Sequence, residues 1–244
     1  MNEKTVLITG ASRGIGEACA RIFARSGFRL VLTCHKNRLQ LEQLKTELEK
    51  AYGAPCLISA GDAGEEDYVD ALFCELEHFS DTLDVLINNA GIAHMGLLQD
   101  MTLDEWEQVI RTNLTSQFLC CRRAIPLMLK RHSGSIVNVS SVWGSHGAAC
   151  EAAYSASKGG SSAFSRALAR ELAPSGIRVN AVEFGVIDTD MNGMLDASEK
   201  QLLCDEIALG RMASPEEAAK FLYDIAVNHP YLTAQALTFD GGWM

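Results

Sequence analysis

Short runs of apolar and β-branched residues alternate with longer segments of helical periodicity along this whole chain. The apolar runs cover residues 4–9, 29–33, 55–59, 83–87, 135–139, 178–182 and 236–239. The helical segments cover residues 15–26, 38–51, 65–79, 103–130, 152–172 and 215–228. Repeated strand-helix-strand units require right-handed crossovers and a parallel sheet that is covered on both faces. The alternation therefore predicts an α/β chain with a doubly wound, parallel sheet of seven strands.

The chain length and composition indicate one domain spanning residues 1–244. Hydrophobic residues make up 48% and charged residues 21% of the chain, which is ordinary globular usage. No linker or internal repeat divides it, and α/β folds of 244 residues are commonly single units. The least regular segment is 190–212, which we interpret as a substrate lid within the domain. An ordinary surface connection is the alternative.

The charge balance and the apolar runs limit the possible partners and the location. The formal net charge of −10 argues against nucleic acid or an anionic membrane as a partner, because both require a basic face. No apolar run approaches the roughly 20 residues that span a bilayer. A strand-like run begins at Lys4, which leaves no room for a signal peptide. We therefore expect a cytoplasmic protein that acts on a small-molecule or carrier-bound substrate.

Cysteine usage agrees with a reducing compartment. The 8 cysteines are scattered, with neither a C-x-x-C pair nor a neighbouring histidine pattern. This arrangement predicts reduced thiols rather than a disulfide framework or a metal site.

A glycine-rich turn follows the first predicted strand and leads directly into a helix. Glycines at such a junction allow a tight turn and let the backbone approach a pyrophosphate, whose charge the helix N-terminus favours. The turn predicts a dinucleotide site in a Rossmann fold. Its candidate binding residues are Gly10, Ser12, Arg13, Gly14, Ile15 and Gly16.

The end of the second predicted strand bears on the choice between NADH and NADPH. A site that selects NAD carries an acid there, whereas residues 33–37 contain none. Arg13, His35 and Lys36 are positioned to pair with a 2′-phosphate, so we expect NADPH/NADP, with NADH less favoured. The alternative is that these cations are simply solvated. Asp62, after the third strand, is a candidate acceptor for the adenine amino group.

Asparagine, alanine and glycine follow the fourth predicted strand. Buried amide side chains can tie neighbouring strands together, while small residues leave room for a cofactor. Asn89, Ala90 and Gly91 are therefore candidate cofactor-lining residues.

Tyr154 and Lys158 lie four residues apart in a strongly helical segment, which places them on one helix face. An ammonium near a phenol stabilises phenolate, so we expect a pKa for Tyr154 that is lowered towards neutrality. A tyrosine of that kind can exchange a proton with an alkoxide. Ser141 follows the fifth strand, where open α/β sheets place ligands, and its hydroxyl can bind a substrate oxygen.

With these motifs in place, the chain resembles the short-chain dehydrogenase/reductase family over essentially its whole length. The family's Asn-Ser-Tyr-Lys tetrad falls on Asn113, Ser141, Tyr154 and Lys158. The resemblance implies that Tyr154 protonates a carbonyl oxygen and that Lys158 also holds the nicotinamide ribose. It implies that Asn113 holds a water in a proton relay; a polar residue that locally bends the helix is the alternative.

The resemblance extends to the segment after the sixth strand. Ile187 and Thr189 match the residues that bind the cofactor carboxamide. Where the family usually has Pro-Gly, this chain has Phe184-Gly185, so that Phe184 either offers an aromatic face to the site or narrows it. Trp143 and Glu151 are further candidate substrate residues.

Among subgroups, the chain resembles 3-oxoacyl-acyl-carrier-protein reductases, including the Phe-Asp-Gly-Gly ending. Against that substrate, the arginines by which those enzymes bind the carrier align with His132 and Ser175. The acidic chain would also repel an acidic carrier. The stretch around Glu151 resembles reductases of an amino-ketone on elongation factor P, which is the leading alternative. A dinucleotide-binding regulator without catalysis is a third possibility.

Small residues at 156, 159, 160 and 163 on the tyrosine helix permit close packing. The family uses this helix and the long one before it for a two-fold interface. The resemblance therefore implies a homotetramer, with a dimer as the alternative.

Overall fold

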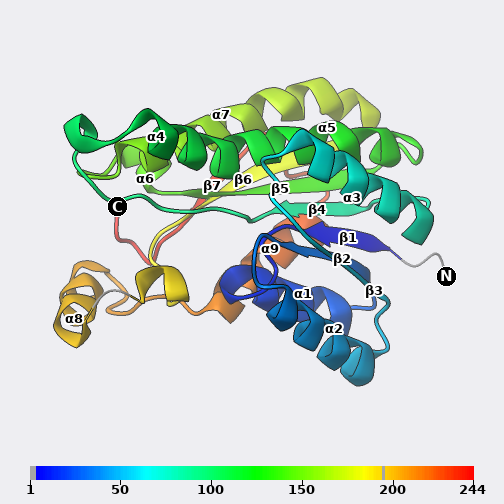
Figure 1. The fold of residues 1–244 in the computed structure, drawn as a ribbon, viewed down its shortest axis with the longest axis horizontal. Helices are drawn as coiled ribbons and strands as arrows, with labels where there is room; N and C mark the ends of the chain where they lie inside the picture. The colour runs from blue at the N-terminus through cyan, green and yellow to red at the C-terminus, as the bar shows by residue number, and fades with distance from the viewer. Residues whose placement is uncertain (1–3, 194–195) are drawn as a thin grey trace.

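Seven parallel strands form one sheet, as the sequence predicts, and their order is β3-β2-β1-β4-β5-β6-β7 (Figure 1). The computed structural model describes residues 4–193 and 196–244. The strands are β1 (Thr5–Ile8), β2 (Arg29–Cys34), β3 (Cys56–Ala60), β4 (Val85–Asn88), β5 (Gly134–Ser141), β6 (Ile177–Phe184) and β7 (Ala236–Phe239). The order reverses between β1 and β4, and ligands of open α/β sheets bind beyond the carboxyl ends of the strands at such a point.

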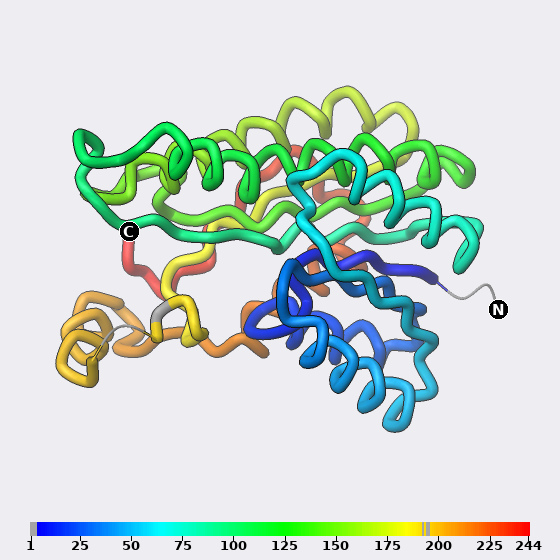
Figure 2. Tube along the Cα trace, viewed as in Figure 1, coloured from blue at the N-terminus to red at the C-terminus, as the bar shows by residue number. Residues whose placement is uncertain are grey.

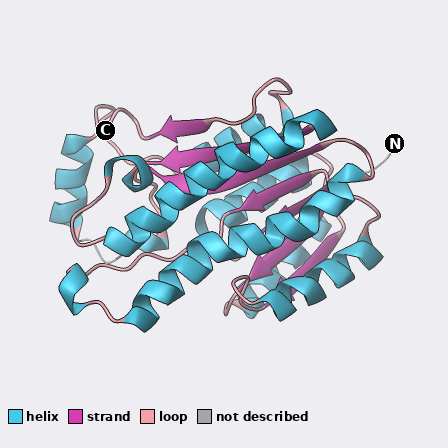
Figure 3. Cartoon of the chain, turned by 90° about the horizontal axis from the view of Figure 1, so that it is seen from above, coloured by secondary structure: helices cyan, strands magenta, loops and turns pink. Residues whose placement is uncertain are grey.

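Helices cover both faces of the sheet, which makes this a single α/β domain of Rossmann type. One layer contains α1, α2 and α9, and the other contains α3, α4, α5 and α7 (Figures 1 and 3). Their bounds are α1 (Gly14–Arg25), α2 (Arg38–Tyr52), α3 (Glu66–Phe79), α4 (Leu103–Ile110), α5 (Ser116–Leu129), α6 (Trp143–His146), α7 (Ala152–Leu172), α8 (Ala197–Glu206) and α9 (Pro215–Val227). Short 3₁₀ turns are η1 (Leu98–Asp100), η3 (Ala173–Ser175) and η4 (Asp190–Asn192).

The hydrophobic core lies in two layers, one on each face of the sheet. Phe23, Leu41 and Leu222 pack from α1, α2 and α9 on one face. Phe73 and Leu127 pack from α3 and α5 on the other. Strands that are buried on both faces need apolar residues at successive positions, which explains the continuous apolar runs in the sequence.

The predicted helix over 103–130 is not a continuous α-helix. It consists of α4, a π-helical turn η2 (Arg111–Thr115) and α5. The π turn contains Asn113, whose side chain is bonded outside the helix, as described below. A single widened turn of this kind is frequently found at functional sites.

The segment 190–212 contains η4 and α8, and residues 194–195 lie outside the described part of the chain. Asp196 caps the N-terminus of α8, and its carboxylate accepts hydrogen bonds from the backbone N–H groups of Ser198 and Glu199. It stands apart from the two helix layers, beyond the carboxyl ends of β5 and β6 (Figure 2). Of the helices in residues 4–193 and 196–244, none has the length and apolar character that crossing a membrane requires.

Candidate active site

The glycine turn between β1 and α1 has the geometry that only glycine allows. Gly10 and Gly14 have φ angles of +66° and +56°, in the left-handed region that disfavours side chains. A Cβ atom on Gly16 would lie 2.2 Å from the carbonyl oxygen of Gly10. The turn therefore presents bare backbone at the N-terminus of α1. That arrangement suits the pyrophosphate of a dinucleotide.

The segment after β4 holds this turn in place. The backbone N–H groups of Asn89 and Ala90 each donate to Thr9 Oγ1 at 3.0 Å. The Asn89 side-chain amide donates to the carbonyl oxygens of Thr9 and Gly10, both at 3.0 Å. Thr9 is a support residue that the sequence analysis missed, because a threonine at the end of a strand carries no distinctive signal.

A second amide pair ties β4 to β5, as expected for this segment. Asn88 donates to Asn138 Oδ1 at 2.8 Å, and Asn138 donates to Ser165 Oγ on α7 at 2.8 Å. These three side chains are buried, so their mutual bonds satisfy groups that water cannot reach. They fix β4, β5 and α7 relative to one another.

The segment after β6 closes the other side of the glycine turn. Ile187 forms a parallel bridge with Ala213, and Thr189 Cγ2 would lie 3.3 Å from a Cβ atom on Gly14. The two parts of the proposed cofactor site thus meet, although 175 positions separate Gly14 from Thr189 in the sequence.

Cys34 is the last residue of β2, and the proposed 2′-phosphate residues His35 and Lys36 follow it directly in the chain. His35 and Lys36 are exposed, and Arg13 forms an ion pair with Asp190 at 3.5 Å. Both partners of that pair are more than half exposed, so it contributes little and leaves Arg13 available to an anion. Asp62, the proposed adenine acceptor, accepts a hydrogen bond from the Gly64 N–H at 2.9 Å.

Ser141, Tyr154 and Lys158 meet at the carboxyl end of β5. Ser141 is the last residue of this strand, and its hydroxyl lies close enough to the Tyr154 phenol to lower the pKa of that phenol. The Lys158 ammonium lies 5.6 Å from the centre of the Tyr154 ring and donates to the Val139 carbonyl oxygen at 2.8 Å. The structure therefore brings together three of the four predicted catalytic side chains.

The pKa values run against one expectation from the sequence. Burial raises the pKa of Tyr154 to about 12; the Ser141 hydrogen bond opposes this rise and the Glu151 charge adds to it. Burial also lowers the pKa of Lys158 to about 8. The predicted lowering of the tyrosine pKa by the lysine is thus wrong for the polypeptide alone, because desolvation dominates at both residues.

Asn113, the fourth predicted residue, connects the π turn to the site. Its Oδ1 accepts from the Ile92 N–H at 2.8 Å, while its Nδ2 donates to the Ile92 carbonyl at 2.9 Å and to Ser157 Oγ at 3.0 Å. A Cβ atom on Gly91 would lie 3.3 Å from Asn113 Oδ1 and 3.4 Å from Lys158 Nζ. Because Gly91 has no side chain, the Asn113 and Lys158 side chains can both lie close to its backbone.

A buried polar network lies behind the catalytic residues and was not predicted. Glu183 on β6 accepts from Ser145 Oγ at 2.8 Å and from Ser162 Oγ at 2.7 Å. Ser162 Oγ lies 3.0 Å from Ser140 Oγ, and the Ser140 hydroxyl donates to the Lys158 carbonyl at 2.8 Å. The available sequence signal was a carboxylate, Glu183, near the carboxyl end of a buried strand.

The three candidate substrate residues occupy different environments. Trp143 is the first residue of α6, and its backbone N–H donates to Ser141 Oγ at 3.2 Å. Glu151 is the residue before α7, makes no capping bond through its side chain, and has a pKa raised by partial burial. Phe184 is 4% exposed and packs edge-to-face on Phe239, with ring centres 5.7 Å apart. Its ring thus belongs to the core between β6 and β7.

Glycines on α7 serve packing within the chain. A Cβ atom on Gly159 would lie 2.9 Å from the Gly144 carbonyl oxygen, and one on Gly160 would lie 2.8 Å from the Leu114 side chain. These two small residues therefore need no subunit interface to explain them.

Comparison with known proteins agrees with this site. Residues 4–200 match the family model for short chain dehydrogenase. The chain is 37% identical over 243 residues to the uncharacterized oxidoreductase YmfI of Bacillus subtilis, covering 98% of each chain. It is 36% identical over 240 residues to the 3-oxoacyl-[acyl-carrier-protein] reductase FabG of Aquifex aeolicus, covering 98% of this chain and 96% of that protein. It is 37% identical over 244 residues to the 3-oxoacyl-[acyl-carrier-protein] reductase of Synechocystis, covering 99% and 97%. The chain belongs to the short-chain dehydrogenase family of NAD(P)-dependent oxidoreductases, which act on CH–OH and C=O groups.

Proposed function

We propose that this enzyme is an NADPH-dependent reductase that converts a ketone to a secondary alcohol. The observation that supports it is the position of Ser141 beside the Tyr154 phenol, with Lys158 next to the same ring, at the carboxyl edge of the sheet. The retained catalytic cluster gives no support to a regulator that has lost catalysis.

The chain's own residues perform the proton half of the reaction. A bound nicotinamide supplies the hydride that forms the new C–H bond at the carbonyl carbon. The Ser141 and Tyr154 hydroxyls bind the carbonyl oxygen, where negative charge develops. Tyr154 transfers its proton to that oxygen, which completes the alcohol and leaves a phenolate. The Lys158 ammonium is the nearby cation that stabilises this phenolate, so a high tyrosine pKa keeps the donor protonated until charge develops.

NADPH is favoured by the charges around the end of β2. Cys34 stands where an NAD-selecting acid would be required, and His35 and Lys36 extend from the same turn into solvent. Arg13 lies on the adjacent glycine turn. Arg13 would leave its exposed ion pair with Asp190 and form a charge-assisted hydrogen bond with a 2′-phosphate.

The first candidate substrate is a 3-oxoacyl chain on a carrier. Support comes from two relatives named as 3-oxoacyl-[acyl-carrier-protein] reductases at 36% and 37% identity. The net charge of −10, and His132 and Ser175 at the positions where arginines bind the carrier, argue against an acidic carrier.

The second candidate is an amino-ketone, such as the modification on elongation factor P. The observation in its favour is Glu151, a partly buried carboxylate without a capping bond whose charge reaches Tyr154. A carboxylate in that position suits a cationic substrate.

One assay distinguishes these substrates. Wild-type enzyme and Glu151→Gln are compared on a 3-oxoacyl thioester, a neutral β-ketoester and an aminoketone, by loss of NADPH absorbance. For an aminoketone substrate, Glu151→Gln should lower kcat/KM by the equivalent of about 1–3 kcal/mol and leave the neutral ketone unchanged. A carrier-type substrate should gain slightly. Equal losses on all three would remove Glu151 from substrate selection.

A homotetramer is the assembly we propose. Exposed apolar side chains on α4 and α5, at Leu103, Phe118 and Leu129, offer a surface that association would bury. Light scattering after size-exclusion chromatography should give about four times the 26.5 kDa chain mass. A monomer mass would contradict the proposal.

A further inference from the structure

The C-terminal tail returns to the catalytic edge of the sheet after β7. Gly185, directly after β6, donates its N–H to the Phe239 carbonyl at 3.0 Å, and a Cβ atom on Gly185 would lie 2.7 Å from Asp240 Cβ. Because Phe184 is paired in register with Ser141, the tail starts beside the strand end that carries the catalytic serine.

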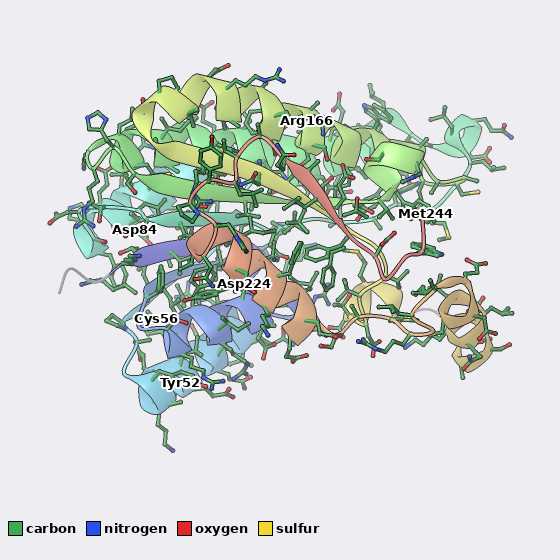
Figure 4. The ribbon with its side chains drawn as sticks, turned by 180° about the vertical axis from the view of Figure 1, so that it is seen from behind. Tyr52, Cys56, Asp84, Arg166, Asp224 and Met244 are labelled. Carbon is green, nitrogen blue, oxygen red and sulfur yellow. The ribbon has the colours of Figure 1, made fainter. Side chains whose placement is uncertain are left out.

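The tail then folds into a fixed turn. Asp240 accepts from the Gly242 N–H and from the Met244 N–H, both at 2.9 Å. Gly241 and Gly242 have φ angles of +69° and +79°, so glycines are required at both positions. Figure 4 shows Met244 at the end of the molecule that carries α8. These bonds fix the backbone on both sides of the residue between Gly242 and Met244.

That residue is Trp243, and its indole contacts both α6 and α8. Its ring centre lies 4.7 Å from that of Trp143 on α6, at an interplanar angle of 60°. Its Nε1 donates to Glu206, the last residue of α8, at 3.3 Å. A further bond runs from the Leu209 N–H to the Gly241 carbonyl at 3.1 Å. The tail thus connects α6 with the segment that follows α8.

The connection ends at a catalytic atom. The Trp143 N–H donates to Ser141 Oγ, so the backbone that carries the first indole touches the hydroxyl proposed to bind the carbonyl oxygen. A substrate oxygen on Ser141 places the rest of the ketone within reach of neighbouring side chains, and large aromatic surfaces there favour apolar groups.

We propose that Trp243 is a specificity-determining residue that, packed edge-to-face against Trp143 and bonded to Glu206, forms an aromatic wall favouring ketones with an extended or aryl apolar substituent over small ketones. This inference rests on the proposed ketone reductase activity. It assigns the tail a role in substrate choice, separate from the binding of the dinucleotide.

The kinetic test compares Trp243→Ala and Trp243→Phe with Trp106→Ala, a control in α4. Each enzyme reduces an aryl diketone and a small β-ketoester with NADPH. Trp243→Ala should lower kcat/KM for the aryl substrate at least about tenfold, chiefly through KM, and change the small ketone less than about twofold. Trp243→Phe should retain most of the preference, and KM for NADPH should stay unchanged. Equal losses on both ketones, or no loss, would overturn the proposal.

A binding test separates failure of this proposal from failure of the proposed function. The aryl diketone is titrated into wild-type enzyme and Trp243→Phe with NADP present, and indole fluorescence is recorded. Saturable quenching that is weakened in Trp243→Phe supports the aromatic wall even if no ketone is reduced. Unchanged quenching in Trp243→Phe, or none in the wild type, contradicts it.

Discussion

The Lys158 ammonium lies 5.6 Å from the centre of the Tyr154 ring and donates to the Val139 carbonyl oxygen, away from bulk water. Burial lowers its pKa from 10.5 to about 8. The side chain is 3% exposed, so the folded protein holds a charge at neutral pH that water would solvate far better. Function and stability therefore make opposite demands on this residue.

We predict that Lys158→Met is more stable than the wild type at pH 7, by on the order of 1–3 kcal/mol in urea unfolding. The pKa difference alone corresponds to about 3–4 kcal/mol, and the expected gain is smaller because the Val139 carbonyl loses its donor. Activity should be lost.

The sign of the pH dependence follows from proton binding. Between pH 8 and 10.5 the unfolded chain holds the Lys158 proton and the folded chain has released it, so wild-type stability rises with pH in this window. The advantage of Lys158→Met should shrink across the same window. Lys50→Met, at an exposed site on α2, is the control and should show no such change. A constant difference between Lys158→Met and wild type would contradict the burial argument.

Replacing the proton donor should affect turnover more than binding. Tyr154→Phe keeps the ring but removes the phenol hydroxyl that lies beside Ser141. Turnover should fall by at least ~10²-fold, as is typical for loss of a general acid. NADPH affinity, measured by fluorescence titration, should change little. Turnover at the wild-type level would remove Tyr154 from the mechanism.

Cofactor preference should respond to one residue at the end of β2. Wild-type enzyme should show higher kcat/KM with NADPH than with NADH. Cys34→Asp supplies an acid that accepts the ribose hydroxyls and repels a 2′-phosphate, so preference should move towards NADH. Arg13→Ala should weaken NADPH binding without affecting NADH. Equal use of both cofactors by the wild type would show that Arg13, His35 and Lys36 do not reach the phosphate.

The fold was predictable because its strands are short, apolar and buried on both faces. Their sequence signal is therefore strong and local. The grouping of the candidate catalytic side chains was predictable for a related reason: Tyr154 and Lys158 share one helix face at fixed spacing, and Ser141 ends a strand whose position the fold dictates.

Other features depend on partners that are distant in the sequence. The π turn at Asn113 forms around bonds to Ile92, and nothing in the local periodicity reveals them. Phe184 is directed into the core by Phe239, and Trp143 meets Trp243 only because β7 ends beside β6. The lowered tyrosine pKa was wrongly predicted because spacing reports proximity but says nothing about desolvation.

The Glu183 carboxylate on β6 accepts hydrogen bonds from Ser145 on α6 and Ser162 on α7. It is 5% exposed, so Glu183→Ala would leave the buried Ser162 hydroxyl without this acceptor, whereas the exposed Ser145 hydroxyl can bond to water instead. An unsatisfied buried group costs about 1–3 kcal/mol, so we expect Glu183→Ala to lose roughly 1–3 kcal/mol of unfolding free energy in urea. Glu183→Gln keeps one acceptor oxygen and should lose about half as much. Glu171→Ala, at an exposed site near the end of α7, is the control and should stay within ~0.5 kcal/mol of wild type. Because Ser162 also contacts Ser140, whose hydroxyl holds the Lys158 carbonyl, turnover should fall with stability in the same order. A Glu183→Ala protein as stable and active as the control would show that α6 and α7 are positioned without this carboxylate.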